Sequence, residues 1–150
     1  MTDLPRTARF AFPLLSVAQA QKEVTHNEAL TLIDALIQLT VEDGPLAAPP
    51  TTPDEGQCWI VGAGASGAWS GRVGTIAVST AGGWRFVAPR EAMRVIRLRD
   101  GAAMTFTGGA WVGPPTLSPP VGGGVVDSEA RSALAALISL IEAHGLLISG

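Results

Sequence analysis

The chain has 150 residues, of which 47% are hydrophobic and only 15% are charged, and its formal net charge is −3. This length fits one compact domain, or a helical part joined to a small β module. The slightly acidic balance excludes a strong global attraction to nucleic acid or to an anionic membrane. Because charged residues usually make up about 25% of a soluble chain, apolar surface is left over that self-association would cover. We therefore expect a homo-oligomer, with no nucleic acid and no membrane as partner.

Cys58 is the only cysteine, which excludes an internal disulfide and a zinc site built from thiolates. We expect it to be a small buried hydrophobe beside Trp59. The first ten residues lack the long apolar core of a secretory signal, and no run approaches the ~18 apolar residues of a membrane span. The sequence thus predicts a protein made in the cytoplasm without a signal peptide. Lysis or an assembled particle would have to carry it outside.

Residues 1–15 are expected to form an extended arm, because Pro5 and Pro13 disfavour a helix. The alternation of basic and aromatic residues from Arg9 to Phe12 is compatible with a short edge strand paired to a neighbouring molecule. A frayed terminus is the alternative.

The longest periodic segment without Gly or Pro predicts a helix over residues 16–41, with Ser16 as N-cap and a stop at Gly44. Its polar residues form one narrow stripe: Glu23, Asn27, Thr31, Asp34 and Gln38.

An ordinary surface helix has a wide polar face, so this helix reads as buried on most sides, in part by other copies of the chain. The stripe is either its solvent face or a polar seam near a symmetry axis. We assign residues 16–44 to an oligomerisation helix whose self-association side chains are Val24, Leu30, Ile33 and Ile37.

Residues 45–56 are rich in proline and predict a linker. Short β-rich runs separated by Gly turns then extend over residues 57–112, with strands expected at 58–61, 74–79, 84–87, 92–98, 103–107 and 110–112. This spacing predicts a small antiparallel meander or barrel. The whole chain is accordingly expected to be an α+β protein.

Two sets of side chains in this β module are candidate binding residues. Trp69, Trp84 and Trp111 each follow a glycine turn, where they either cover the end of a small sheet or form a sugar-stacking platform. Arginines gather between residues 72 and 99, either for solubility and pairing between subunits or for attraction to an acidic polysaccharide. The candidate carbohydrate-binding residues are Trp69, Trp84, Trp111, Arg94 and Arg97.

A second helix is expected within residues 125–147, after a Pro/Gly-rich linker. Asp127 is its expected N-cap. An apolar stripe with a spacing of three and four residues includes Leu134, Leu137 and Ile141, which we assign to self-association.

No motif in the chain predicts catalysis. The GxGxxG run at Gly62–Gly67 follows a predicted strand, but no helical period, second parallel strand or acidic residue follows at the spacing of a dinucleotide site. His26 and His144 are the only histidines and lack the neighbours that a metal site needs. We expect no enzyme activity, no cofactor and no metal site.

The string QAQKEVTHNEAL at residues 19–30, preceded by Leu14–Leu15, resembles a family of phage-derived proteins of alphaproteobacteria that is described only as a domain of unknown function. The resemblance extends from about residue 10 to residue 112. It continues through residues 33–39, 56–61, 67–71, 82–89 and 109–111.

That resemblance implies a virion structural protein. Members look like fibre or spike components of tailed phages and of gene transfer agents, which implies a homotrimer that contacts capsid, tail or fibre subunits. Unlike in long fibre members, no large receptor-binding or depolymerase domain follows within these 150 residues. We expect a short spike, an attachment base or an adaptor, released in a phage-like particle by lysis. A module that binds host capsular polysaccharide is the alternative.

Overall fold

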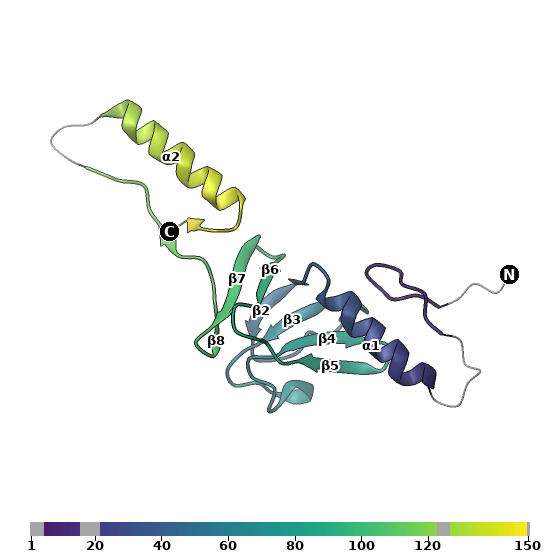
Figure 1. Ribbon diagram of the computed structural model, residues 1–150. Helices are drawn as coiled ribbons and strands as arrows, with labels where there is room; N and C mark the ends of the chain where they lie inside the picture. Colours follow the sequence, from purple (N-terminus) through teal and green to yellow (C-terminus); the bar gives the residue numbers. More distant parts are fainter. Residues whose placement is uncertain (1–4, 16–21, 123–126, 150) are drawn as a thin grey trace.

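The computed structural model describes residues 5–15, 22–122 and 127–149, which form a mixed α+β protein, as the sequence predicts (Figure 1). The described elements are α1 (Lys22–Leu36), β1 (Thr40–Val41), β2 (Asp43–Leu46), β3 (Cys58–Val61), a 3-10 turn (Gly67–Trp69), β4 (Ile76–Thr80), β5 (Gly83–Val87), β6 (Arg94–Arg97), β7 (Ala102–Thr107), β8 (Ala110–Val112), β9 (Thr116–Leu117), α2 (Ser128–Ala143) and β10 (Ile148–Ser149).

Two four-stranded sheets make up the β module. Their strand orders are β1-β6-β7-β8 and β2-β3-β4-β5, and β9 pairs with β10 in a separate ribbon. Each four-stranded sheet has two free edges, so the predicted alternative of a closed barrel is wrong. β3, β4 and β5 pair antiparallel, as do β6, β7 and β8. Strands β3 and β8 have the bounds that the sequence predicts, β4 to β7 differ from prediction by one or two residues at an end, and β1, β2, β9 and β10 were not predicted.

One extended segment, from Thr40 to Leu46, belongs to both sheets. Its first half, β1, pairs parallel with β6, where Thr40 lies opposite Ile96. Its second half, β2, pairs parallel with β3, where Leu46 lies opposite Val61. Between the halves, the Glu42 N–H donates to the carbonyl oxygen of Cys58 at 2.8 Å. The two sheets are therefore joined by a continuous backbone as well as by packing.

This shared segment corrects two predictions from the sequence. The expected helix over residues 16–41 ends at Leu36, and the expected linker from residue 45 begins as strand β2. The helix stops because Gln38 adopts the left-handed conformation, with φ of 48°. Thr40 and Val41 follow, and their β-branched side chains favour extended backbone. Ser16, the predicted N-cap, lies outside the described residues.

The core lies between the two sheets and under α1. Side chains alternate along each strand, so one face of the β2-β3-β4-β5 sheet presents Cys58, Ile60, Ile76 and Val78 to this core. They pack with buried residues of α1 and the other sheet: Ala35, Leu39, Val41, Val95 and Met104. Cys58 is buried, as predicted, and its burial raises the pKa of the thiol to about 11.

The other face of the same sheet is covered by the chain itself. The connection between β3 and β4 folds over this face and places Trp69 against Trp59 and Trp84, with ring centroids 6.5 and 5.2 Å away. Within the GxGxxG run, the N–H groups of Gly62 and Ser66 donate to the carbonyl oxygens of Leu46 and Ala47. The run is thus part of a covering loop, and the strand that follows it is antiparallel.

The N-terminal segment differs from the expected extended arm. Residues 5–15 turn back on themselves, with an antiparallel bridge between Arg6 and Pro13. The Thr7 N–H donates to the Phe12 carbonyl at 2.9 Å, and the Leu14 N–H donates to the Pro5 carbonyl at 2.8 Å. We call residues 5–15 the N-terminal turn. This turn packs on α1 of its own chain.

Helix α2 is shorter than the predicted 125–147 and begins at the predicted cap. Asp127 accepts a hydrogen bond from the Ala130 N–H at 2.8 Å, which satisfies one of the free N–H groups of the first turn. After Gly145 the chain forms β10, which pairs parallel with β9. Helix α2 lies apart from the two sheets and projects from the body of the molecule (Figure 1).

The shared segment generates the first prediction. Gly44 has φ of 137°, and a Cβ there would lie 2.6 Å from the carbonyl oxygen of Ile60. We expect Gly44→Ala to lower the free energy of unfolding by about 3 kcal/mol or more, since both the backbone conformation and the contact with β3 become unfavourable. Thermal or urea unfolding measures this effect.

Gly64→Ala is the matched control. Gly64 also has a positive φ, of 71°, but a Cβ there meets no atom within 4 Å. Its expected cost is about 1 kcal/mol, from backbone strain alone. Equal losses in the two variants would contradict the role assigned to the contact between Gly44 and β3.

Candidate assembly surfaces

Helix α1 covers the core with one side and leaves apolar side chains on the other. Ala35 is buried in the core, whereas Val24 is 63% and Ile33 48% exposed. Ile37, in the turn after the helix, is also exposed, and Leu30 is half-buried. These four are the residues that the sequence assigns to self-association, and within one molecule three of them are exposed and the fourth, Leu30, is half-buried.

Helix α2 also leaves apolar side chains exposed to solvent. Leu134, Leu137 and Leu140 are exposed, with Leu140 at 58%, and Ile141 is half-buried. Ile138 is the one residue of this helix that is buried. Its side of the helix faces the preceding linker, where the Arg131 guanidinium donates to the carbonyl oxygens of Pro120 and Gly122. Helix α2 thus contacts the linker through Arg131, and Leu134, Leu137 and Leu140 remain exposed.

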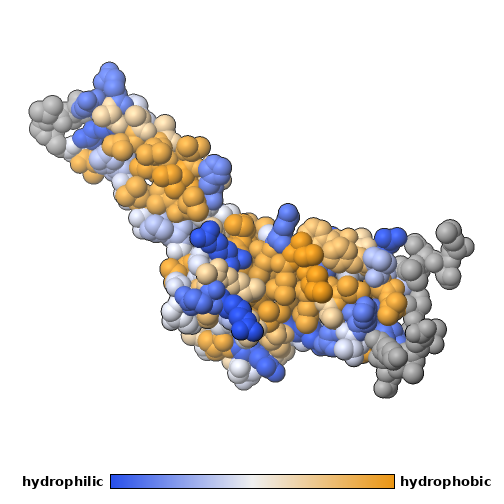
Figure 2. All heavy atoms as spheres, viewed as in Figure 1, coloured by the Kyte–Doolittle hydropathy of each residue, from blue (hydrophilic) through white to orange (hydrophobic). Residues whose placement is uncertain are grey.

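Figure 2 shows where this apolar surface lies. On the face in view, apolar residues cover much of α2, and a second broad apolar area lies over the body of the molecule. Exposed apolar patches of this extent usually mark an interface. Among the described helices, neither has the length and hydropathy needed to cross a bilayer.

Two residues of the polar stripe of α1, Asp34 and Asn27, contact the chain's own N-terminal turn, which neither of the two alternatives from the sequence includes. Asp34 is only 2% exposed, and its carboxylate accepts hydrogen bonds from the N–H groups of Arg9 and Phe10, both at 2.7 Å. The Arg9 guanidinium in turn donates to the Ala35 carbonyl oxygen at 2.6 Å and to Thr40 Oγ1 at 2.5 Å. This arrangement fixes the turn to the end of α1 and the start of β1.

Asn27, another member of the stripe, and its neighbour Glu28 also find partners in the same chain. The side chain of Asn27 both accepts from and donates to the backbone of Leu15, at 2.9 and 3.0 Å. Glu28, next to it, forms an ion pair of 2.5 Å with Arg85 of β5. The sequence pattern marks these residues as polar, but only the fold shows that the N-terminal turn and β5 lie against them.

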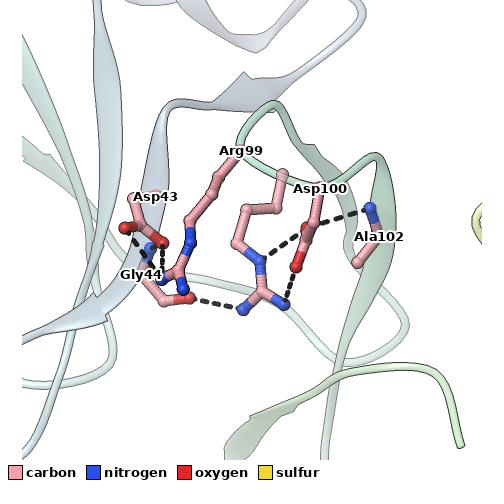
Figure 3. A network of polar contacts seen from close by, with 6 residues as sticks. Asp43, Gly44, Arg99, Asp100 and Ala102 are labelled. Atoms are coloured by element: carbon pink, nitrogen blue, oxygen red, sulfur yellow. Dashed lines mark hydrogen bonds and ion pairs between the residues drawn. The ribbon is translucent and has the colours of Figure 1, made fainter. Parts of the chain in front are cut away.

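The arginine cluster is largely occupied by intramolecular contacts (Figure 3). Arg97 forms two hydrogen bonds with the Asp100 carboxylate, at 2.9 and 2.7 Å, and a third with the Gly44 carbonyl oxygen at 2.9 Å. Arg99 lies 3.3 Å from the Asp43 carboxylate. The hydrogen bonds from Arg97 lower the pKa of Asp100, and the same bonds raise that of Arg97. The network ties the β6–β7 turn to the shared segment.

The structure does not bring the candidate carbohydrate-binding residues together into a platform. Trp69 is 0% exposed and has no ring face open to a ligand, so it is removed from that set. The indole N–H of Trp111 donates to the Gly74 carbonyl at 2.8 Å, and its ring packs against Phe106. With Trp69 buried and Arg97 held by Asp100, the carbohydrate hypothesis stays a prediction that rests on Trp84, Trp111 and Arg94.

A comparison with family models identifies the β module. Residues 26–112 match the model described as "Protein of unknown function (DUF2793)". The chain belongs to this family. The matched range runs from within α1 to the end of β8, so the DUF2793 region contains both sheets and excludes the N-terminal turn and α2. The curated proteins contain no match to the chain.

An open pocket that the sequence did not reveal lies between the N-terminal turn and the DUF2793 region. It has a volume of about 460 Å³ and is lined by residues of three segments: the N-terminal turn, the end of the α1–β1 connection and β6. Its lining includes Phe10, Leu39 and Ile96, with Arg9 and Arg94 as charged members. Among the described residues, no three His, Cys, Asp or Glu side chains gather as metal ligands. The lining thus combines apolar side chains with two arginines.

Asp34 generates the second prediction. We expect Asp34→Asn to lower the free energy of unfolding by about 1–3 kcal/mol, because an amide offers one acceptor oxygen where the carboxylate offers two to the turn, and its NH₂ group would face a backbone N–H. Thermal unfolding measures the loss. Asp54→Asn, at an exposed position, is the control and should leave stability nearly unchanged. Equal stability of the two variants would contradict the assigned role of Asp34.

Proposed function

We propose that this protein is a homo-oligomeric structural component of a phage-like particle, either a gene transfer agent or a tailed phage. The observation that carries the proposal is the apolar surface left uncovered on both helices. The match to the family model shows only that the chain belongs to that family. The association with phage-like particles rests on the resemblance of the QAQKEVTHNEAL string at residues 19–30.

The size of the apolar surface favours association through both helices. Complete burial of a Val, Leu or Ile side chain contributes about 1.5–3 kcal/mol. Leu134, Leu137 and Leu140 are about half exposed, so on α2 alone they would contribute only about half of that amount each. Association costs on the order of 4–15 kcal/mol in lost freedom. A stable oligomer thus requires α1 as well, with Val24, Ile33 and Ile37.

Within the particle, we propose a position at a fibre, a spike or its attachment base. The homotrimer that the resemblance implies fits this position, because fibres and spikes are built around a rotational axis. Capsid, tail or fibre subunits are the proposed partners, and release of the particle by lysis places the protein outside the cell. We propose no catalytic step, since the charged side chains described above are occupied in holding the fold together.

The oligomeric state is the direct test. Native mass spectrometry or light scattering at micromolar concentration should detect an oligomer, with a trimer expected. The double variant Leu134→Asp/Leu137→Asp should dissociate it, because it places charges within the apolar surface of α2. Val73→Asp is the control, since Val73 is equally exposed but lies in the loop before β4. A monomeric parent protein would contradict the proposal, and circular dichroism verifies that the variants fold.

The place of action needs a separate experiment. Particles from the producing bacterium can be labelled with an antibody against this protein and examined by electron microscopy. Label at the head or tail surface is expected. An oligomeric protein with no label on particles would refute the particle assignment while leaving self-association intact.

A further inference from the structure

The exposed side of α2 has the spacing of a coiled-coil seam. Ala130, Leu134, Leu137 and Ile141 follow one another at intervals of four, three and four residues, which places them alternately at the d and a positions of a heptad. Leu140 lies beside this row at a g position and extends the apolar strip. Leu134 and Leu137 are exposed, and Ile141 is half-buried. The helix thus presents two consecutive heptad pairs that its own chain leaves largely open.

Charged residues are kept off this seam. In the same heptad numbering Glu129 falls at c, Arg131 at e and Glu142 at b. The Arg131 side chain is also turned to the linker, where it donates to the Pro120 and Gly122 carbonyls. When identical helices pair along the a/d row, no like charges face each other across it, so a second copy of this same helix fits the seam electrostatically.

The C-terminal end of α2 is fixed to the body. The Ala103 N–H donates to the Gly145 carbonyl at 2.9 Å. Gly145 packs so closely there that a Cβ would lie 2.2 Å from the Gly101 carbonyl oxygen. The N-terminal end of α2 points away from the sheets (Figure 1). With a rise of 1.5 Å per residue, the 16-residue helix projects about 24 Å.

We propose that α2 helices from different copies pair parallel and in register as a short coiled coil, with Leu134, Leu137 and Ile141 in its core. The inference rests on the proposed homo-oligomer. In a closed cyclic assembly of three copies, equivalent helices point the same way along the axis, so antiparallel pairing cannot satisfy all three. Apolar surface on α2 and on the body lies on one face (Figure 2), which lets both surfaces meet neighbouring copies in the same assembly.

Cysteine crosslinking of the full chain tests orientation and register. Ala130→Cys and Ile141→Cys place a thiol near each end of the seam, and Cys58 is buried, with a raised pKa that keeps it unreactive. Disulfides form between cysteines only when their Cα atoms approach within about 7 Å. Under mild oxidation with diamide, each variant alone should give crosslinked pairs on a non-reducing gel. Ser132→Cys, at an f position on the opposite side of the helix, is the control and should crosslink several-fold less.

Any other result contradicts the proposed coiled coil. The individual results also distinguish a failure of the coiled coil from a failure of the proposed function. If crosslinks form only when Ala130→Cys and Ile141→Cys proteins are mixed, the helices are antiparallel. If neither variant links while native mass spectrometry still detects an oligomer, α2 is not the seam and self-association survives. If the parent protein is monomeric, both proposals fall. The three substitutions are at exposed or half-buried positions, and circular dichroism checks that each variant folds.

Discussion

The double pairing of one short backbone segment is the constraint on which the rest of the molecule depends. Thr40 to Leu46 contributes a strand to each sheet, so the two sheets cannot separate without breaking one extended chain. Gly44 makes this possible, because a side chain at this position would collide with β3. The Arg97–Asp100 network then fixes the β6–β7 turn to the same segment. The remaining strands of the two four-stranded sheets follow by antiparallel pairing, β4 on β3 and β5 on β4 in one sheet, and β7 on β6 and β8 on β7 in the other.

This arrangement of the two sheets leaves apolar side chains exposed to solvent. Two short sheets enclose a small core, and α1 seals it with one side only, around Ala35 and Asp34. Helix α2 adds almost nothing to that core, since Ile138 is its one buried residue and belongs to neither core cluster. The surplus hydrophobicity of the composition is thus concentrated on two helical faces. These two faces are the surfaces on which the proposed self-association depends.

Several elements were predictable because their signals are local. The hairpin strands follow from alternating β-rich runs and glycine turns, Asp127 is a capping residue at a helix start, and the seven self-association residues follow from helical periodicity. In the structure these seven residues stay wholly or partly exposed. The end of α1 was missed, because the left-handed conformation of Gln38 has no marker in the sequence. The strand β2 was missed for a related reason, since Pro45 is unusual in a strand and reads as linker.

The amino-acid sequence by itself determined the α+β class, the strands β3 to β8 approximately, both helices and the membership of residues 26–112 in one family. These features depend on neighbours a few residues apart. Only the tertiary structure decided which polar groups meet: Asp34 with the N-terminal turn, Arg97 with the Gly44 carbonyl, and Glu28 with Arg85. Those partners are separated by 25 to 57 positions, and no periodicity of one segment encodes a contact with another. For the same reason, the burial of Trp69 and the open side of α2 emerged only when the chain was folded.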